Sequence, residues 1–195
     1  RRRRTRQNFN PRSPRGGDAT ALCRRFDRNT GFRLLASDLD VPVEDSFQVG
    51  HFADLNHPDV IINCAGLTDV RACERQPEEA YKVNAIGARN LAVAARRIDA
   101  KLIQLSTDDV FDGAGSSALC EFDDAHPATM YGKSKYAGEK LVRELTDKHV
   151  IVRSSWLYGA GADGLVLPTV WAEIGMIRPG AYPGGDALPP TPGAY

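Results

Sequence analysis

Three short apolar runs alternate with two helical segments in the middle of this 195-residue chain. The runs cover residues 59–64, 101–106 and 149–154, and β-branched residues are frequent in them. Apolar side chains recur at helical spacing over 77–98, and a second helix is expected from Tyr131 to about Thr146. The order strand, helix, strand, helix, strand predicts an α/β fold with a doubly wound parallel sheet covered by helices.

Polar and small residues follow each of the three apolar runs. In open parallel sheets, ligands bind beyond the carboxyl ends of the strands. Residues 63–66, 106–108 and 153–156 fall at these ends. The sequence therefore predicts a functional site at this edge of the sheet.

Tyr131 and Lys135 lie four residues apart, which places both on one helix face. A free phenol has a pKa near ~10, and an ammonium one turn away is expected to lower it. A hydroxyl from a strand end, Ser106 or Thr107, could hold a carbonyl oxygen beside the tyrosine. This is the proton half of a carbonyl reduction whose hydride comes from a nicotinamide cofactor. The Tyr-x-x-x-Lys pattern alone also occurs by chance on amphipathic helices.

Five ordered motifs occupy about half of the chain. They are Asn-Cys-Ala-Gly at 63–66, Val-Asn-Ala at 83–85, Ser-Thr-Asp-Asp-Val-Phe-Asp-Gly at 106–113, Tyr-Gly-Lys-Ser-Lys with Ala-Gly-Glu at 131–139, and Arg-Ser-Ser-Trp-Leu-Tyr-Gly at 153–159. In this order they resemble the dTDP-4-dehydrorhamnose reductase group of the extended short-chain dehydrogenase/reductases. The resemblance implies a Rossmann-like α/β fold for residues 58–159.

The resemblance also implies roles for individual residues. Thr107, Tyr131 and Lys135 would form the catalytic group, with Thr107 favoured over Ser106. The cofactor would be NADPH, with NADH left open. No residue is assigned to a metal, and a metal at a dimer contact is left open. The implied cofactor contacts within the motifs are Asn63, Ala65, Gly66, Ser106, Tyr131 and Lys135, and the implied substrate contacts are Thr107, Asp108 and Trp156. Packing in the core is an equally good interpretation of Trp156.

The beginning of the chain departs from that family, which starts with an apolar strand and a glycine-rich turn for the pyrophosphate. Residues 1–15 carry seven arginines and no acid, and only Gly16 and Gly17 stand where the turn is expected. The second strand is predicted at Phe32–Asp38, so that Asp38 or Asp40 would lie near the adenosine. We assign Gly16, Gly17 and Asp40 to the cofactor site.

The far end departs as well, because residues 160–195 contain six prolines and many glycines. We expect residues 1–15 to be a disordered basic tail and 16–159 to be an NAD(P)-binding Rossmann-like domain with an incomplete sheet. Residues 160–195 would be an irregular remnant of the smaller sugar-binding domain. The chain is thus interpreted as a fragment, or as the product of a frame-disrupted or mis-predicted gene, with an intact middle.

Composition limits the partners and the compartment. The basic tail is typical of nucleic-acid-binding segments, but no downstream segment interleaves aromatic with basic residues, so no nucleic-acid partner is expected. The four cysteines form no Cys-x-x-Cys pair, which argues against a zinc or redox motif and for a reducing compartment. No apolar run could span a membrane and no secretion signal is visible, so a cytoplasmic protein is expected.

Two classes of function remain open. The first is an enzyme that reduces the 4-keto group of a dTDP-linked deoxysugar with NADPH to give dTDP-L-rhamnose, or a reductase of a related nucleotide sugar. The second is a non-catalytic NADP-binding regulatory protein that resembles the beta subunit of methionine adenosyltransferase. The Thr107, Tyr131 and Lys135 set favours the enzyme for the parent gene, while this chain, as a fragment, is expected to be only weakly active. A homodimer is left open.

Overall fold

The computed structural model describes the central part of the chain. The described residues are 33–37, 40–114, 119–120, 122–155, 159–160 and 166–167. The predicted basic tail, Gly16, Gly17, Trp156 and most of the predicted sugar-domain remnant lie outside them. The proposed domain boundaries therefore stay predictions.

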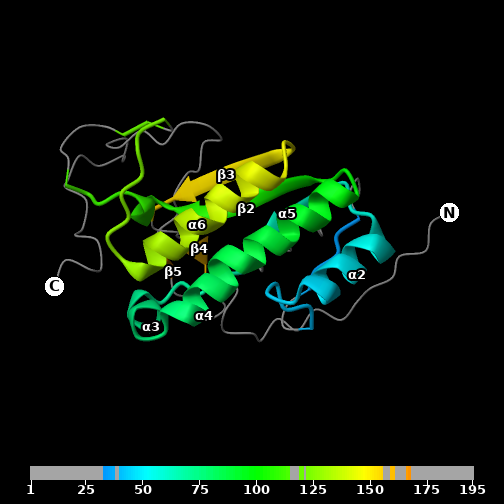
Figure 1. The fold of residues 1–195 in the computed structure, drawn as a ribbon, viewed down its shortest axis with the longest axis horizontal. Coiled ribbons are helices and arrows are strands. Elements are labelled where there is room, and N and C mark those ends of the chain that lie inside the picture. The colour runs from blue at the N-terminus through cyan, green and yellow to red at the C-terminus, as the bar shows by residue number, and fades with distance from the viewer. Residues whose placement is uncertain are drawn as a thin grey trace.

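A three-stranded parallel sheet forms the centre of the described part (Figure 1). Its strands are β1 (Val60–Asn63), β2 (Lys101–Thr107) and β3 (His149–Ser154), in the order β1-β2-β3. In the register, Val60 pairs with Lys101 and Ser106 pairs with Arg153. The three predicted strands and the predicted parallel α/β fold are confirmed, and the carboxyl ends of all three strands point to one edge. A separate antiparallel pair joins β4 (Gly159–Ala160) and β5 (Val166–Leu167).

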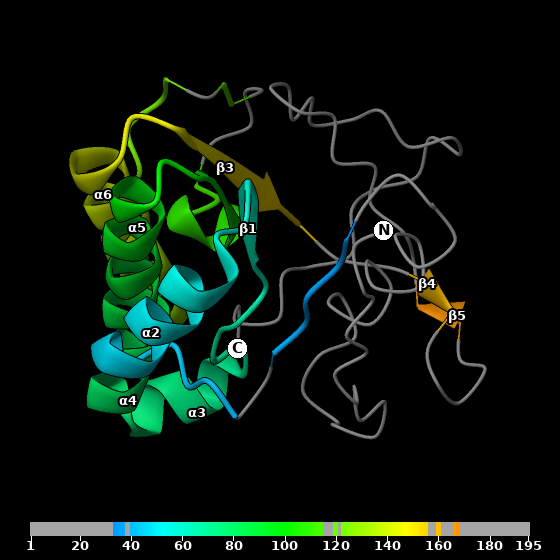
Figure 2. The same cartoon turned by 90° about the vertical axis from the view of Figure 1, so that its right-hand side faces the viewer.

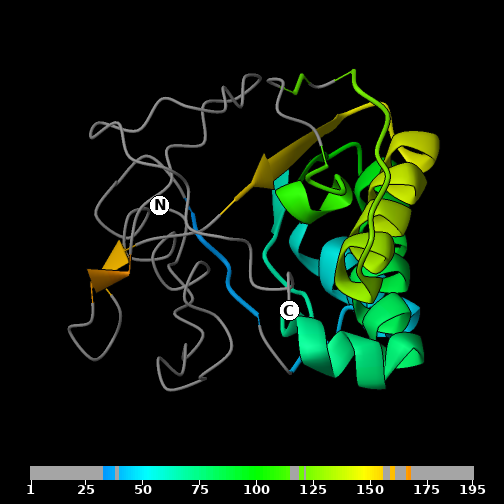
Figure 3. The ribbon, with the colours of Figure 1, turned by 90° about the vertical axis from the view of Figure 1, so that its left-hand side faces the viewer.

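The two predicted helices are also confirmed, and they pack against the sheet. The first begins as α4 (Pro77–Tyr81), passes through a π segment (Lys82–Ile86) and continues as α5 (Gly87–Arg97). The second is α6 (Met130–Leu145). Figures 2 and 3, from opposite sides, show α5 and α6 together on one face of the sheet. None of the described helices has the length and apolar character that crossing a lipid bilayer requires.

Small side chains let α5 and α6 approach each other and the sheet closely. The core between them consists of alanines from α5 and from the turn that follows it, together with larger residues from β2 and α6: Ala88, Ala92, Ala95, Ala100, Leu102 and Val142. Gly138 of α6 lies directly against the backbone of the π segment. A β-carbon at this position would overlap Asn84 O and would lie 3.3 Å from Ala88 Cβ.

Two further helices were not foreseen. Helix α2 (Ser46–Asn56) is capped by Asp45, whose carboxylate accepts hydrogen bonds from the Phe47 and Gln48 backbone amides at 2.9 and 3.1 Å. Its residues Val49 and Ala53 pack on α5, beside which it lies in Figure 2. Helix α3 (Val70–Arg75) is capped by Asp69 in the same way. An aspartate before a helical segment is a helix-start signal, and Asp45-Ser46 carried it.

The strand predicted at Phe32–Asp38 is wrong over the residues that the structure describes. Residues 33–37 have no β-structure, and none of them pairs with β1, β2 or β3. A segment with strand-like composition becomes a strand only when its backbone groups form a ladder with a neighbour. The apolar residues of this segment thus predicted a ladder that it does not form with the described sheet.

The close approach at Gly138 gives a prediction of unusual sign. Replacing glycine by alanine inside a helix ordinarily stabilises a protein by about 0.5–1 kcal/mol. Gly138→Ala is instead expected to lower the free energy of unfolding by about 1–3 kcal/mol, because the new methyl group meets backbone that cannot move aside. Urea unfolding of the two proteins measures this difference.

Gly50→Ala in α2 is the matched control for that experiment. A β-carbon there would meet only the end of the flexible Arg97 side chain, at 2.9 Å. We expect a near-neutral effect, within about 0.5 kcal/mol. A stabilising Gly138→Ala would contradict the packing described above.

Candidate active site

The structure brings Thr107 and Tyr131 together from two different elements. Thr107 is the last residue of β2, and Tyr131 lies in the first turn of α6. Their side chains share a hydrogen bond. The predicted convergence of these two hydroxyl groups is therefore present, while their catalytic roles stay a prediction.

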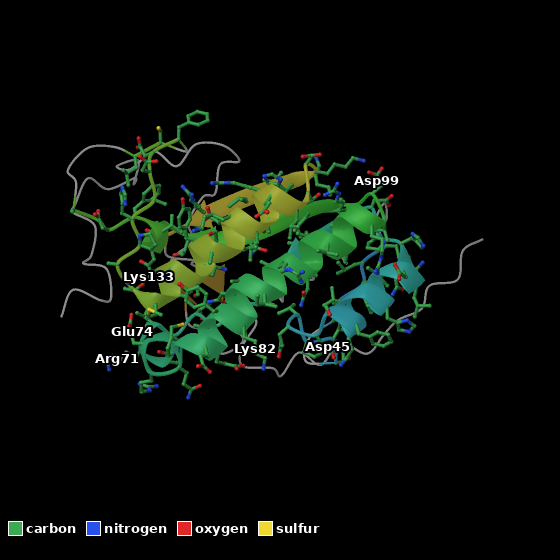
Figure 4. All side chains as sticks on the ribbon, viewed as in Figure 1. Asp45, Arg71, Glu74, Lys82, Asp99 and Lys133 are labelled. Atoms are coloured by element: carbon green, nitrogen blue, oxygen red, sulfur yellow. The ribbon has the colours of Figure 1, made fainter. Side chains whose placement is uncertain are left out.

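Three local features fix the start of α6 at this place. Thr129 caps the helix by accepting a hydrogen bond from the Gly132 amide at 3.0 Å. Glu74, at the end of α3, accepts one from the Met130 amide at 2.7 Å, and Figure 4 shows Glu74 close to the start of α6. A β-carbon at Gly132 would overlap Asp109 O, so glycine allows the helix to meet the chain that follows β2.

Lys135 lies one turn after Tyr131 and is buried, with 7% of its surface exposed. Its ammonium donates a hydrogen bond to the Leu105 carbonyl at 2.7 Å. A β-carbon at Gly66, beyond the end of β1, would lie 3.6 Å from Lys135 Nζ. The ammonium is thus held between β2 and the turn after β1.

The pKa of Tyr131 differs from the sequence expectation. Burial of the phenol raises its pKa from 10.0 to about 12, and the charges of Asp109, Cys73 and Asp108 add to the rise. The hydrogen bond with Thr107 lowers the pKa, but not enough to offset burial. The expected lowering by Lys135 is wrong for this structure, because desolvation outweighs every stabilising contact of the phenolate. At neutral pH, Tyr131 is a protonated phenol that can donate a proton.

Two aspartates follow Thr107 in a single 3₁₀ turn, Asp108–Val110. The Thr107 hydroxyl accepts a hydrogen bond from the Asp109 amide at 3.2 Å and donates one to Asp108 Oδ1 at 3.4 Å. Burial raises the pKa of both carboxyl groups, and repulsion by Asp109 raises the pKa of Asp108 further. This end of the site therefore disfavours additional negative charge.

Two asparagines organise the turn that follows β1. Asn63 Oδ1 accepts a hydrogen bond from the Ala65 amide at 3.0 Å. Asn84, in the π segment, accepts one from the Leu67 amide at 2.8 Å and donates to Leu67 O at 3.0 Å and to Ser134 Oγ at 2.9 Å. Asn84 thereby joins the turn to α6, and π segments are frequent at functional sites. Asn84 was absent from the predicted site, although its motif was recognised.

Ser106 has a partner that the sequence did not suggest. Its hydroxyl donates a hydrogen bond to Glu139 Oε1 at 2.6 Å, inside the molecule. Glu139 also binds Arg153 of β3. The cofactor contact assigned to Ser106 stays a prediction. The sequence did offer a signal for Glu139: it lies four residues after Lys135, and therefore on the same face of α6 as Tyr131 and Lys135.

The remaining predicted site residues divide into two groups. Asp40 lies in an exposed turn before α2, and its contact with adenosine stays a prediction. Gly16, Gly17 and Trp156 lie outside the described residues. Within the described ranges, no three histidine, cysteine, aspartate or glutamate side chains are grouped to hold a metal ion.

Comparisons with known proteins identify the family of the chain. The sequence model of the family described as RmlD substrate binding domain matches residues 15–170. The chain is 38% identical over 146 residues to the spore coat polysaccharide biosynthesis protein SpsK of Bacillus subtilis, covering 74% of this chain and 51% of that protein. It is 41% identical over 149 residues to the dTDP-4-dehydrorhamnose reductase of Aggregatibacter actinomycetemcomitans, covering 75% and 50%.

A solved structure gives the same match. The dTDP-4-dehydrorhamnose reductase of Bacillus anthracis in complex with NADP superposes with a TM-score of 0.67 at 39% identity, over 71% of this chain and 51% of that one. The chain thus spans about half the length of the relatives that it matches. The Rossmann-like α/β fold is shared with them.

The raised pKa of Tyr131 predicts how stability depends on pH. Because folding favours the protonated phenol, its contribution to stability is complete below the ordinary pKa of about 10 and is lost as the pH rises towards 12. The free energy of unfolding should fall over this range by on the order of 2 kcal/mol more in the wild type than in Tyr131→Phe. Urea unfolding at several pH values measures it, and parallel curves for the two proteins would contradict the assignment.

Proposed function

Because the chain belongs to the RmlD substrate-binding-domain family, we propose that it carries the cofactor-binding and proton-donating part of a dTDP-4-dehydrorhamnose reductase. The reaction is the reduction of the 4-keto group with NADPH to give dTDP-L-rhamnose. One observation carries the proposal: a half-buried tyrosine, kept protonated, shares a hydrogen bond with a threonine at the end of a parallel strand. The Lys135 ammonium lies one helical turn away.

The turn after β1 fits a nicotinamide dinucleotide. A side chain at Gly66 would lie 3.1 Å from Asn84 Oδ1 and 3.6 Å from Lys135 Nζ, so glycine keeps the backbone open beside the lysine. This turn lies at the carboxyl end of the sheet, where parallel α/β folds bind such ligands. Asn63, Ala65, Gly66 and Lys135 would hold the cofactor. When bound, NADPH supplies the hydride.

Tyr131 supplies the proton in this proposal. As the carbonyl carbon is reduced, its oxygen becomes an alkoxide, which is a stronger base than a phenolate. Proton transfer from a phenol with a pKa of about 12 is therefore favourable. The Thr107 hydroxyl, fixed by the Asp109 amide, orients the oxygen that receives the proton. Lys135 contributes by binding rather than by acidifying the phenol.

The substrate, the assembly and the compartment belong to the proposal too. The relatives' names supply the dTDP-linked sugar, for which Thr107 and Asp108 would be contacts on this chain. A cytoplasmic location and a homodimer would fit a biosynthetic reductase of this kind. Nucleic acid and membrane have no part in the proposed reaction.

A turnover assay with dTDP-4-dehydrorhamnose and NADPH tests the proposal. Tyr131→Phe should reduce kcat by about 10²–10⁴-fold, because it removes the proton donor, and should leave NADPH binding intact in a fluorescence titration. Tyr136→Phe is the matched control, because Tyr136 lies on the same helix. The change removes only its hydroxyl group and keeps the ring that contacts Lys140, so kcat should be unchanged. Equal activity of the wild type and Tyr131→Phe would reject Tyr131 as the proton donor. NADPH binding without turnover in either would mean that this chain is the cofactor-binding part alone, since it spans about half the length of the reductases that it matches.

The protonated state of Tyr131 also predicts the pH dependence of the two reaction directions. Reduction needs the phenol, which persists up to a pH approaching 12, so kcat for reduction should be flat through neutral pH. The reverse oxidation needs the phenolate, so its rate should rise with pH throughout the range from 7 to 10. Initial rates in both directions measure this, and an oxidation rate that levels off near neutral pH would contradict the raised pKa.

A further inference from the structure

The stripe of α6 that faces the sheet carries three polar residues at four-residue spacing: Tyr131, Lys135 and Glu139. The proposed reaction uses Tyr131 and Lys135 but assigns no role to Glu139. Yet Glu139 has no exposed surface at all. An ionised carboxylate at such a place is costly unless it is paired and hydrogen-bonded.

Glu139 meets that requirement through two strands at once. Ser106 Oγ of β2 donates to Oε1 at 2.6 Å. Arg153 of β3 donates from Nε to Oε1 at 3.0 Å and to Oε2 at 3.2 Å, and from Nη2 to Oε2 at 2.7 Å. Ser106 and Arg153 are themselves paired in the sheet register. Arg143, half-exposed on the same helix, adds a contact at 3.3 Å.

The last three residues of β2 each contact one member of this stripe. The contacts join the Leu105 carbonyl to Lys135, the Ser106 hydroxyl to Glu139, and the Thr107 side chain to Tyr131. Of the three stripe residues, Glu139 also forms a buried ion pair with a second strand, through Arg153 of β3. Sliding or rotating α6 would break it and leave the Arg153 charge buried without its partner, which is strongly unfavourable.

We propose that Glu139 is a positioning residue: it holds α6 at the place along β2 where Tyr131 meets Thr107. Its role in turnover rests on the proposed function, whereas its effect on the phenol does not. The reach of the Glu139 side chain, and not only its charge, sets the distance between helix and strand. The alternative is an ion pair that stabilises the fold and leaves the site unaffected.

Two substitutions separate reach from charge. Glu139→Asp keeps the charge but shortens the side chain by one methylene, so that its carboxylate reaches Ser106 and Arg153 only if α6 moves. Glu139→Gln keeps the length and removes the charge. The matched control is Glu144→Gln, which removes an exposed carboxylate from the same helix.

The first readout is the turnover of the full chain. Glu139→Asp should lower kcat by about 10-fold or more, because small displacements of reacting groups are costly, and KM should change less. Glu139→Gln should keep kcat within about 3-fold while losing more stability than the aspartate variant. If kcat instead follows stability, with the glutamine variant the slower, the positioning role is rejected.

The second readout is the titration of Tyr131 and needs no substrate. Absorbance after a rapid pH jump reports the phenolate before the protein unfolds, and Tyr131→Phe in each background isolates the signal. Since burial is the largest cause of the raised pKa, a displaced helix that admits water should lower the pKa of Tyr131 below about 12 in Glu139→Asp. Glu139→Gln and Glu144→Gln should titrate as the wild type. A wild-type titration in Glu139→Asp would overturn the inference.

These readouts separate the two proposals. If the wild type does not reduce the keto sugar, the turnover readout is lost, and the phenol titration alone decides the role of Glu139. If Glu139→Asp does not fold, as judged by circular dichroism, the double variant Glu139→Leu/Arg153→Met replaces it. Removing both buried charges together is often tolerated. In this double variant a lowered pKa of Tyr131 supports positioning, and an unchanged one rejects it.

Discussion

The contact between α6 and the π segment determines where most of the site lies. Gly138 allows the backbone of Asn84 to reach the surface of α6, and any larger residue would separate them. At this distance the Asn84 side chain can bond both Ser134 of α6 and the turn after β1 through Leu67. A single close approach thus fixes the helix that carries the phenol and the turn that is proposed to hold the cofactor. The alanines of α5 serve the same purpose along the rest of the interface.

Burial, rather than the nearby ammonium, controls the protonation of the site. An ammonium within one helical turn lowers a phenol pKa in water-like surroundings. Here the free-energy cost of desolvating the Tyr131 phenolate is larger than the stabilisation from such a charge. The Lys135 ammonium is in addition bound to the Leu105 carbonyl, which competes for its charge. A sequence pattern gives the spacing of two groups but not their hydration. For this reason, the sign of the pKa shift could not be read from Tyr131 and Lys135 alone.

The sequence predicted those parts of the structure that depend on periodicity. All three described strands of the parallel sheet and both long helices follow from apolar spacing, and the meeting of Thr107 with Tyr131 follows from the carboxyl ends of parallel strands. The strand expected at Phe32–Asp38 does not form over residues 33–37, because pairing requires a neighbouring strand that composition cannot supply. Helix α2 was missed although Asp45 marks its start. Glu139 was missed because its partner Arg153 is near it only after the sheet and α6 have packed.

The two aspartates beside the Tyr131 phenol disfavour negative charge at this end of the site. Asp108 and Asp109 both have raised pKa values, and both raise the pKa of Tyr131. Every additional negative charge at this end of β2 therefore costs free energy, whether it is carried by a carboxylate, a phenolate or an alkoxide. Protonation of an oxygen that develops negative charge here would therefore be favoured. The hydroxyl groups of Tyr131 and Thr107 lie at this place. The same repulsion opposes a phenolate at Tyr131, so the environment that keeps the phenol protonated would suit a proton donor in the proposed reduction.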